Sequence, residues 1–182
     1  MGFRQGFKAE SNRIALRVRE QMGLSPIDAI DPAAVCTHFD IELIKLSEID
    51  SDSQFLGVDN SPFSAVTVPR GIATAIVHND SHHPYRQSSN ICHELAHCFL
   101  GHKCTPPLTP GGERARDGGI EAEANFLGGA LLIPNEAAIY ILRSGLLPQA
   151  QGLYGVSAQM LEYRLRMSGA QRILERSRLK RA

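Results

Sequence analysis

Residues 86–102 of this 182-residue chain read RQSSNICHELAHCFLGH. The stretch contains the motif H-E-x-x-H, formed by His93, Glu94 and His97. Positions four apart lie on the same face of a helix, so both imidazoles can reach one metal ion. Glu94 lies beside the first of them, where a general base is needed. The spacing therefore predicts a helix that carries a hydrolytic metal centre.

The remainder of this helix is apolar enough to be buried. In a projection at about 100° per residue, His97, Asn90 and Glu94 follow His93 within an arc of roughly 100°. Most of the other positions are apolar, with His102 as an exception. A buried arc of two histidines and a glutamate needs partners, which a metal ion would supply. The alternative is a core helix whose histidines are satisfied by hydrogen bonds alone.

A catalytic zinc site needs a third protein ligand, with a fourth position left open. The run GIEAEANFLGGALLIP, residues 119–134, places Glu121 and Asn125 four apart on one helix face. We expect Glu121 to be the third metal ligand and Asn125 to orient a ligating histidine through a hydrogen bond. Glu123, about 200° away around the helix, is the alternative metal ligand and is otherwise expected to be a solvated charge. The small residues of this run predict close packing against the first helix.

Several stretches of the chain resemble one family of metallopeptidases. HELAHCFLGH, followed after a loop by EAEANFLGGALLIP, is similar to the ImmA/IrrE-type metallopeptidases. The resemblance extends upstream to IVHNDSHHPYRQSSNICHE, to RIALRVREQMGL and DPAAVCTHFDIELIKL nearer the N-terminus, and downstream to GVSAQMLEYRLRMSG. It therefore covers nearly the whole chain.

The resemblance implies a gluzincin-like site. His93, His97 and Glu121 would hold the metal, and Glu94 would be the general base. Cys92 and Cys98 stand beside these residues and are not part of the family pattern that we expect.

The resemblance also implies a function. The chain would be a zinc-dependent endopeptidase that hydrolyses an internal peptide bond of a protein substrate. That substrate would be a helix-turn-helix transcriptional repressor, cut in a stress or mobile-element response. Ligation by two nitrogens and an oxygen also suits Mn²⁺ or Fe²⁺. The competing hypothesis is a non-catalytic metal-binding module that binds a partner protein, and Glu94 favours the hydrolase because such a module has no use for an acid there.

The coarse pattern predicts an α+β fold. Helices are expected at residues 8–22, 32–38, 135–144 and 158–167, in addition to the two that carry the candidate metal ligands. Strands are expected in IELIKL, DSQFLGVDN, SAVTVP and TAIVHN. We therefore expect a zincin-like helical domain with a small, mainly antiparallel sheet of three or four strands beside the H-E-x-x-H helix. A free edge of that sheet could bind an extended substrate peptide.

Composition limits the other functions. Lys plus Arg and Asp plus Glu both number 19, which argues against direct nucleic-acid binding. We expect a single domain over residues 1–182, with a basic, partly disordered tail from about residue 170. The N-terminus lacks the apolar core of a signal peptide, and no apolar run approaches the ~20 residues that span a bilayer, so a cytoplasmic protein without membrane association is expected. The four cysteines are then free thiols, and no pattern indicates the oligomeric state.

Some polar residues near the motif receive no role. His82, His83, Tyr85 and Arg86 could reach the site as a proton donor or oxyanion stabiliser, or they could be a solvated loop and helix start.

The segment after the motif helix, KCTPPLTPGGERARDGG, is rich in proline and glycine and could gate the site. A rival zinc site from Cys98, His102 and Cys104 matches no standard spacing. His102 is instead expected to line the helix end after Gly101.

Overall fold

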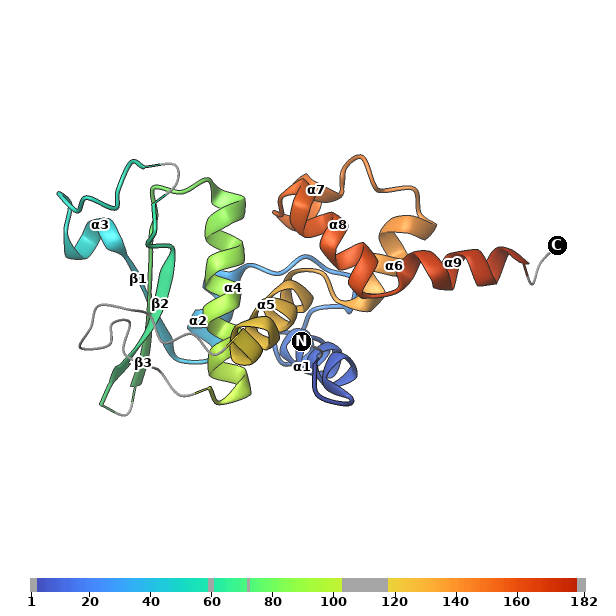
Figure 1. Ribbon diagram of the computed structural model, residues 1–182, viewed down its shortest axis with the longest axis horizontal. Coiled ribbons are helices and arrows are strands. Elements are labelled where there is room, and N and C mark those ends of the chain that lie inside the picture. The colour runs from blue at the N-terminus through green and yellow to red at the C-terminus, as the bar shows by residue number, and fades with distance from the viewer. Residues whose placement is uncertain (1–2, 59–60, 72, 103–117, 180–182) are drawn as a thin grey trace.

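The computed structural model describes residues 3–58, 61–71, 73–102 and 118–179 (Figure 1). In chain order its elements are α1 (Phe7–Gln21), α2 (Pro32–His38), β1 (Ile41–Lys45), α3 (Leu46–Ile49), β2 (Ala65–Arg70), β3 (Ala73–His78), α4 (Pro84–Leu100), α5 (Gly118–Leu132), α6 (Asn135–Arg143), α7 (Ala150–Tyr154), α8 (Ala158–Met167) and α9 (Ala170–Leu179). The expected α+β, zincin-like fold is confirmed. The segment rich in proline and glycine after the motif helix lies almost wholly outside the described residues.

Helix α4, which carries the H-E-x-x-H motif, lies in the middle of the molecule. The three-stranded sheet packs on one side of it, and α5 crosses it on another (Figure 1). Helix α1 packs against α5, and α6 to α9 form the end of the molecule away from the sheet. The two helices that carry the candidate ligands therefore pack directly against each other.

The sheet has the order β1-β3-β2, with β2 and β3 antiparallel and β1 and β3 parallel. It is thus mixed rather than mainly antiparallel. The β2–β3 hairpin forms locally around Gly71, whose φ of 66° suits a tight turn. The long connection from β1 to β2 returns the chain to the opposite edge, so that β1 pairs with β3 in parallel. As a result, β2 is an edge strand, and it packs against α4.

One strand prediction was wrong. Residues 52–58, part of DSQFLGVDN, form successive turns instead of a strand. Their backbone is held from elsewhere, because the Asn79 side-chain amide donates to the Phe55 carbonyl and the Ser81 hydroxyl accepts from the Gly57 N–H. Such contacts override the β propensity of a short apolar run.

Residue choice at its ends defines α4. His83 caps the N-terminus by accepting a hydrogen bond from the Tyr85 N–H at 3.2 Å, and Pro84 occupies the first helical position. At the other end Gly101 adopts the left-handed conformation, with φ at 66°. The Gly101 N–H then donates to Cys98 and the His102 N–H to His97, the pattern that ends many helices. This turn directs His102 back over the last turns of α4.

Two other predicted helix starts are also confirmed. Asp31 caps α2 by accepting from the Ala33 N–H at 3.0 Å. Ser157 caps α8 by accepting from the Met160 N–H at 3.2 Å.

The basic tail begins with a helix. Residues 170–179 form α9, which packs against α6 and α8, and Ala170 is fully buried. Its apolar positions recur at helical spacing, which the run of charged residues obscured. Residues 180–182 lie outside the described part of the chain.

The core joins α4, α5 and the helices packed on them. From α4 it includes Ile91, Cys92, Leu95 and Ala96, all at most 6% exposed.

In the described ranges no single helix is long and apolar enough to cross a bilayer, and α5 with α6 meets that criterion only as a pair bent by 50°.

Candidate metal centre

His93, His97 and Glu121 converge where α4 and α5 cross. One potential ligand atom from each lies within 4.8 Å of the other two. Among the described residues this is the one group of three or more histidine, cysteine or acidic side chains placed to hold a metal ion. The three residues expected to converge therefore do so: helical spacing aligns His93 with His97, and the crossing of the two helices brings Glu121 to them.

The distances between these atoms suit a small divalent ion. The two Nε2 atoms are 3.0 Å apart, and Glu121 oxygens lie 3.5 Å from Nε2 of His93 and 3.8 Å from Nε2 of His97. Nitrogen and oxygen ligands about 2.0–2.1 Å from a tetrahedral zinc are roughly 3.3 Å apart. The donor set, two imidazoles and a carboxylate, is also one that catalytic zinc uses. The residues present thus fit a metal.

Both histidines have an outer partner for the ring nitrogen that faces away from this centre. Nδ1 of His93 is 3.0 Å from the Oδ1 atom of Asn125, and Nδ1 of His97 is 3.0 Å from Nδ1 of His102. Burial, followed by the neighbouring His93, lowers the pKa of His97 to about 4. His97 is therefore neutral near pH 7, the state in which an imidazole can bind a metal.

Glu94 faces the sheet rather than α5. The Thr67 hydroxyl, on edge strand β2, donates to the Oε2 atom of Glu94 at 2.6 Å. This short bond to the carboxylate fixes its orientation through one oxygen, Oε2. Thr67 was not singled out from the sequence, because its contact with Glu94 depends on how the hairpin packs against α4.

Glu123 lies outside the group of candidate ligands. Its Oε1 atom is 3.3 Å from Nε of Arg4, and its Oε2 atom is 3.8 Å from Nε2 of His102. The side chain is only 18% exposed. The expectation of a solvated charge was therefore wrong: the Glu123 carboxylate is largely buried between two basic groups.

Helices α4 and α5 approach each other at backbone distance. A Cβ atom placed on Gly128 would lie 3.0 Å from the Cys92 carbonyl oxygen and 3.1 Å from the Cα atom of His93. These contacts are tighter than most real Cβ contacts, and the atoms met are backbone, so a side chain here would push the two helices apart by a few tenths of an ångström. The predicted close packing is confirmed, and it takes place beside a candidate ligand.

A family model, that of the IrrE N-terminal-like domain of peptidase family M78, matches residues 36–166. This is more than two thirds of the chain, and it includes all of α4, α5 and α6. The chain belongs to this family. A search of curated proteins found no match.

The M78 match and the ligand group together support a metal-binding protein of a peptidase family. Neither the family match nor the candidate ligand group requires a cysteine as a metal ligand. Cys36 and Cys92 are at most 1% exposed, and burial raises the pKa of the Cys36 thiol to about 12 and also raises that of Cys92. Both are therefore neutral thiols at physiological pH, which makes them poor metal ligands. Cys104, a member of the rival zinc site, lies outside the described residues.

A cavity of about 1130 Å³ opens next to the candidate metal centre. Ser89, one turn before His93, lines it, as do Asn125 and Ala122, the neighbour of Glu121 in sequence. The other lining residues come from the N-terminal segment, the start of α4, and α7 and α8 with the turn between them: Phe3, His83, Tyr85, Arg86, Gln151, Ser157, Ala158, Gln159, Met160, Glu162, Tyr163 and Arg166.

Three of the four unassigned residues near the motif, His83, Tyr85 and Arg86, thus line this cavity and are not part of the ligand group. His82, the fourth, is 6% exposed, so the expectation of a solvated loop does not hold for it.

Proposed function

We propose that this chain is a zinc-dependent endopeptidase in which His93, His97 and Glu121 hold the metal and Glu94 is the general base. The observation that carries the proposal is the convergence of the three ligand atoms within 4.8 Å, with Glu94 between the two histidines in sequence. Membership of a peptidase family supports the same conclusion.

The residues at this site have separate roles in hydrolysis. A zinc ion bound here supplies a Lewis acid that polarises the scissile carbonyl and makes a water molecule more acidic. Glu94, held by Thr67 through one oxygen, uses the other oxygen to take a proton from the attacking water. It then returns that proton to the departing amine. Asn125 accepts a hydrogen bond from His93 Nδ1–H and so keeps Nε2 directed at the centre.

Two features offer room for a polypeptide substrate. Strand β2 packs on α4 and, among the described residues, pairs with a strand on one side alone, so an extended peptide can pair with its other edge in the way that added strands bind sheets. The 1130 Å³ cavity on the other side of α4 is far larger than one side chain. We infer that several substrate residues on one side of the cleaved bond occupy it, packed against Tyr163 and Met160.

The resemblance to ImmA/IrrE-type peptidases supports a narrower proposal. It makes the substrate a helix-turn-helix transcriptional repressor that is cut in a stress or mobile-element response. A candidate is a repressor encoded beside this chain's gene. The proposal predicts that the purified chain with zinc cuts that repressor at one internal bond, and that Glu94→Gln does not cut it.

The second candidate function is a metal-binding module that grips a partner protein without cutting it. It shares the three ligands, so metal binding alone does not separate the two functions. The Thr67–Glu94 hydrogen bond favours the peptidase, because a module without catalysis gains nothing from an oriented carboxylate at this position.

The test combines metal content with hydrolysis of a mixed peptide library, for wild type, Glu121→Ala, Glu123→Ala and Glu94→Gln. With zinc supplied in excess, so that a weaker affinity does not lower the content, we expect about one equivalent of zinc in every protein except Glu121→Ala. Cleavage is expected in wild type and Glu123→Ala, and we expect Glu94→Gln to lose it by about 10²–10⁴-fold.

Two results would change the proposal. Loss of zinc in Glu123→Ala, with retention in Glu121→Ala, would show that Glu123 and not Glu121 is the third ligand. Full zinc binding with no cleavage of the library or of the neighbouring repressor would favour the binding module. A wild-type chain that binds no zinc would overturn both functions.

A further inference from the structure

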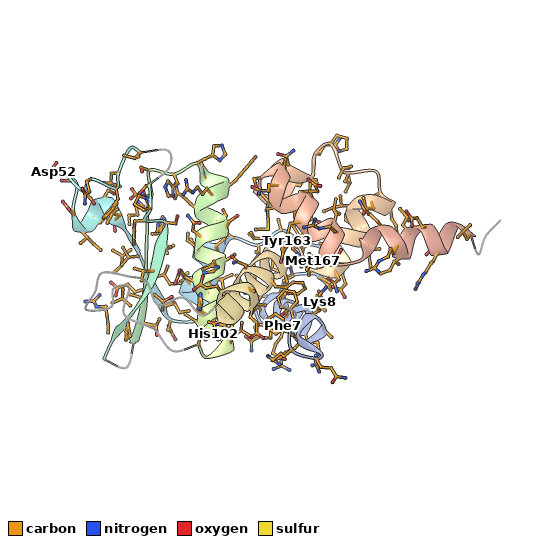
Figure 2. The ribbon with its side chains drawn as sticks, viewed as in Figure 1. Phe7, Lys8, Asp52, His102, Tyr163 and Met167 are labelled. Atoms are coloured by element: carbon orange, nitrogen blue, oxygen red, sulfur yellow. The ribbon has the colours of Figure 1, made fainter. Side chains whose placement is uncertain are left out.

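The ring of His102 contacts a candidate metal ligand although no metal role was expected for it. Its Nδ1 atom is 3.0 Å from Nδ1 of His97, and the two rings meet edge to face with centroids 5.0 Å apart. The side chain is only 11% exposed. The turn at Gly101 causes this contact, because it hydrogen-bonds the His102 N–H to the His97 carbonyl. Figure 2 labels His102 near the end of α4, next to α5.

Beyond His102 the contacts continue to the N-terminal segment. Nε2 of His102 is 3.8 Å from a Glu123 oxygen, and the other Glu123 oxygen is 3.3 Å from Nε of Arg4. Arg4 is itself held by Glu10, whose two oxygens accept from its guanidinium at 2.6 and 2.9 Å. A continuous series of side-chain contacts therefore runs from Glu10 through Arg4, Glu123 and His102 to His97.

The metal site determines which atom donates and which accepts in each contact between these side chains. If Nε2 of His97 binds the metal, its Nδ1 carries the proton and must donate. Nδ1 of His102 is then the acceptor, so the proton of His102 resides on Nε2. Nε2 lies 3.8 Å from a Glu123 oxygen, longer than a hydrogen bond, so the carboxylate, an acceptor only, favours a proton at Nε2 through its charge. Every member thus has a role compatible with its neighbours.

We propose that His102 and Glu123 position His97 for metal binding, as Asn125 does for His93. The inference rests on the proposed metal site and assigns it two further positioning residues. His97–His102–Glu123 is a histidine bound to a second histidine that is oriented in turn by a carboxylate. Arg4 fixes that carboxylate, so the N-terminal segment is coupled to the metal centre.

Zinc affinity of the full chain, measured by competition with a chromophoric chelator, tests this role. His102→Phe keeps a ring but removes the acceptor, and we expect a 10–100-fold weaker affinity. His102→Asn places an amide oxygen where Nδ1 was, and we expect an affinity within about threefold of wild type. Glu123→Gln should lie between them. His38→Phe, the same substitution at an exposed histidine of α2, is the matched control and should change nothing.

A second readout needs no substitution. Long-range ¹H–¹⁵N NMR spectra of the zinc-loaded wild type distinguish the two neutral imidazole tautomers. We expect the Nδ1–H form at His97 and the Nε2–H form at His102. The absorption bands of the Co²⁺-substituted protein should also shift in His102→Phe and stay unchanged in His38→Phe.

The outcomes separate this inference from the proposed function. Wild-type affinity in His102→Phe, or the Nδ1–H tautomer at His102, would overturn the positioning role and leave the three-ligand site standing. A wild-type chain that binds no zinc would overturn both. Weak binding in His102→Phe that His102→Asn does not restore would also count against the role, because the acceptor at Nδ1 is what the inference requires.

Discussion

Gly128→Ala is expected to loosen the crossing of α4 and α5 and weaken the metal site. In an open helix, replacing glycine by alanine stabilises by roughly 1 kcal/mol. At Gly128 the new methyl group would meet the Cys92 carbonyl oxygen at 3.0 Å and the His93 Cα at 3.1 Å. Those atoms are backbone and cannot rotate away, so the helices must separate by several tenths of an ångström. Overpacking of this kind costs about 1–3 kcal/mol.

Gly152→Ala is the matched control. Gly152 lies in the short helix α7, is exposed, and a Cβ there would meet nothing within 4 Å. It should gain the roughly 1 kcal/mol of helix propensity without the clash. The free energies of unfolding of the two variants should therefore differ by about 1–3 kcal/mol. For a chain of this size that corresponds to about 2–12 °C in melting temperature.

Two measurements check the reasoning at Gly128. Calorimetry of the metal-free variants gives the difference in stability, and chelator competition gives zinc affinity. The methyl group presses on α4 at His93, while Glu121 moves with α5. We therefore expect about tenfold weaker zinc affinity in Gly128→Ala and an unchanged zinc affinity in Gly152→Ala. A Gly128→Ala protein as stable as Gly152→Ala, with unchanged zinc affinity, would refute the claim that backbone contact sets the ligand geometry.

Three further perturbations test separate parts of the structure. Thr67→Val removes a hydrogen bond to a charged acceptor, worth about 1.5–3 kcal/mol, so kcat should fall by roughly tenfold or more while zinc content stays constant. Asp31→Ala removes the α2 cap, and the free energy of unfolding measured in urea should drop by about 1 kcal/mol. Burial, followed by Arg86, lowers the pKa of His82 below its usual range. The unfolded chain therefore binds the proton more readily, and the stability contribution present above about pH 6.5 is lost as pH falls. Urea unfolding of His82→Phe should show a weaker decline between pH 7 and pH 5 than wild type, and an equal decline would contradict this assignment.

Local spacing was sufficient to predict which side chains share a helix face at the candidate metal centre. His93 with His97, and Glu121 with Asn125, are each four residues apart, and helix geometry alone places such pairs on one face. The glycines and alanines of α5 likewise predicted its close approach to α4. These predictions depend only on contacts within a helix or on side-chain size, which the sequence states directly.

The contacts that were missed join residues far apart in the chain. Glu123 pairs with Arg4, and Thr67 bonds to Glu94 across the packing of a hairpin on a helix. Neither follows from periodicity, because both depend on how whole elements pack. His102 is an intermediate case. Gly101 marks the helix end in the sequence, and the geometry of a glycine turn at a helix end indicates that His102 folds back toward His97.

The position of Glu121 depends on what holds the other end of α5. Arg19, from α1, and Arg164, from α8, are both fully buried. Arg19 donates to the Leu132 carbonyl at 3.2 Å, and Arg164 donates to the Ile133 carbonyl at 2.8 Å. These carbonyls lie at and just beyond the end of α5, where a helix leaves acceptors unpaired and carries partial negative charge.

Both arginines remain charged while performing this role. Burial lowers the pKa of each to about 10, which still leaves the guanidinium protonated at neutral pH. The ring of Phe126, the residue after Asn125 and only 2% exposed, lies 5.1 Å from the Arg164 guanidinium and adds a favourable cation–π contact. Helix α5 is thus anchored by two cations at its C-terminal end and by backbone contact at Gly128. It is this anchoring of a rigid helix that presents Glu121 to the histidines of α4.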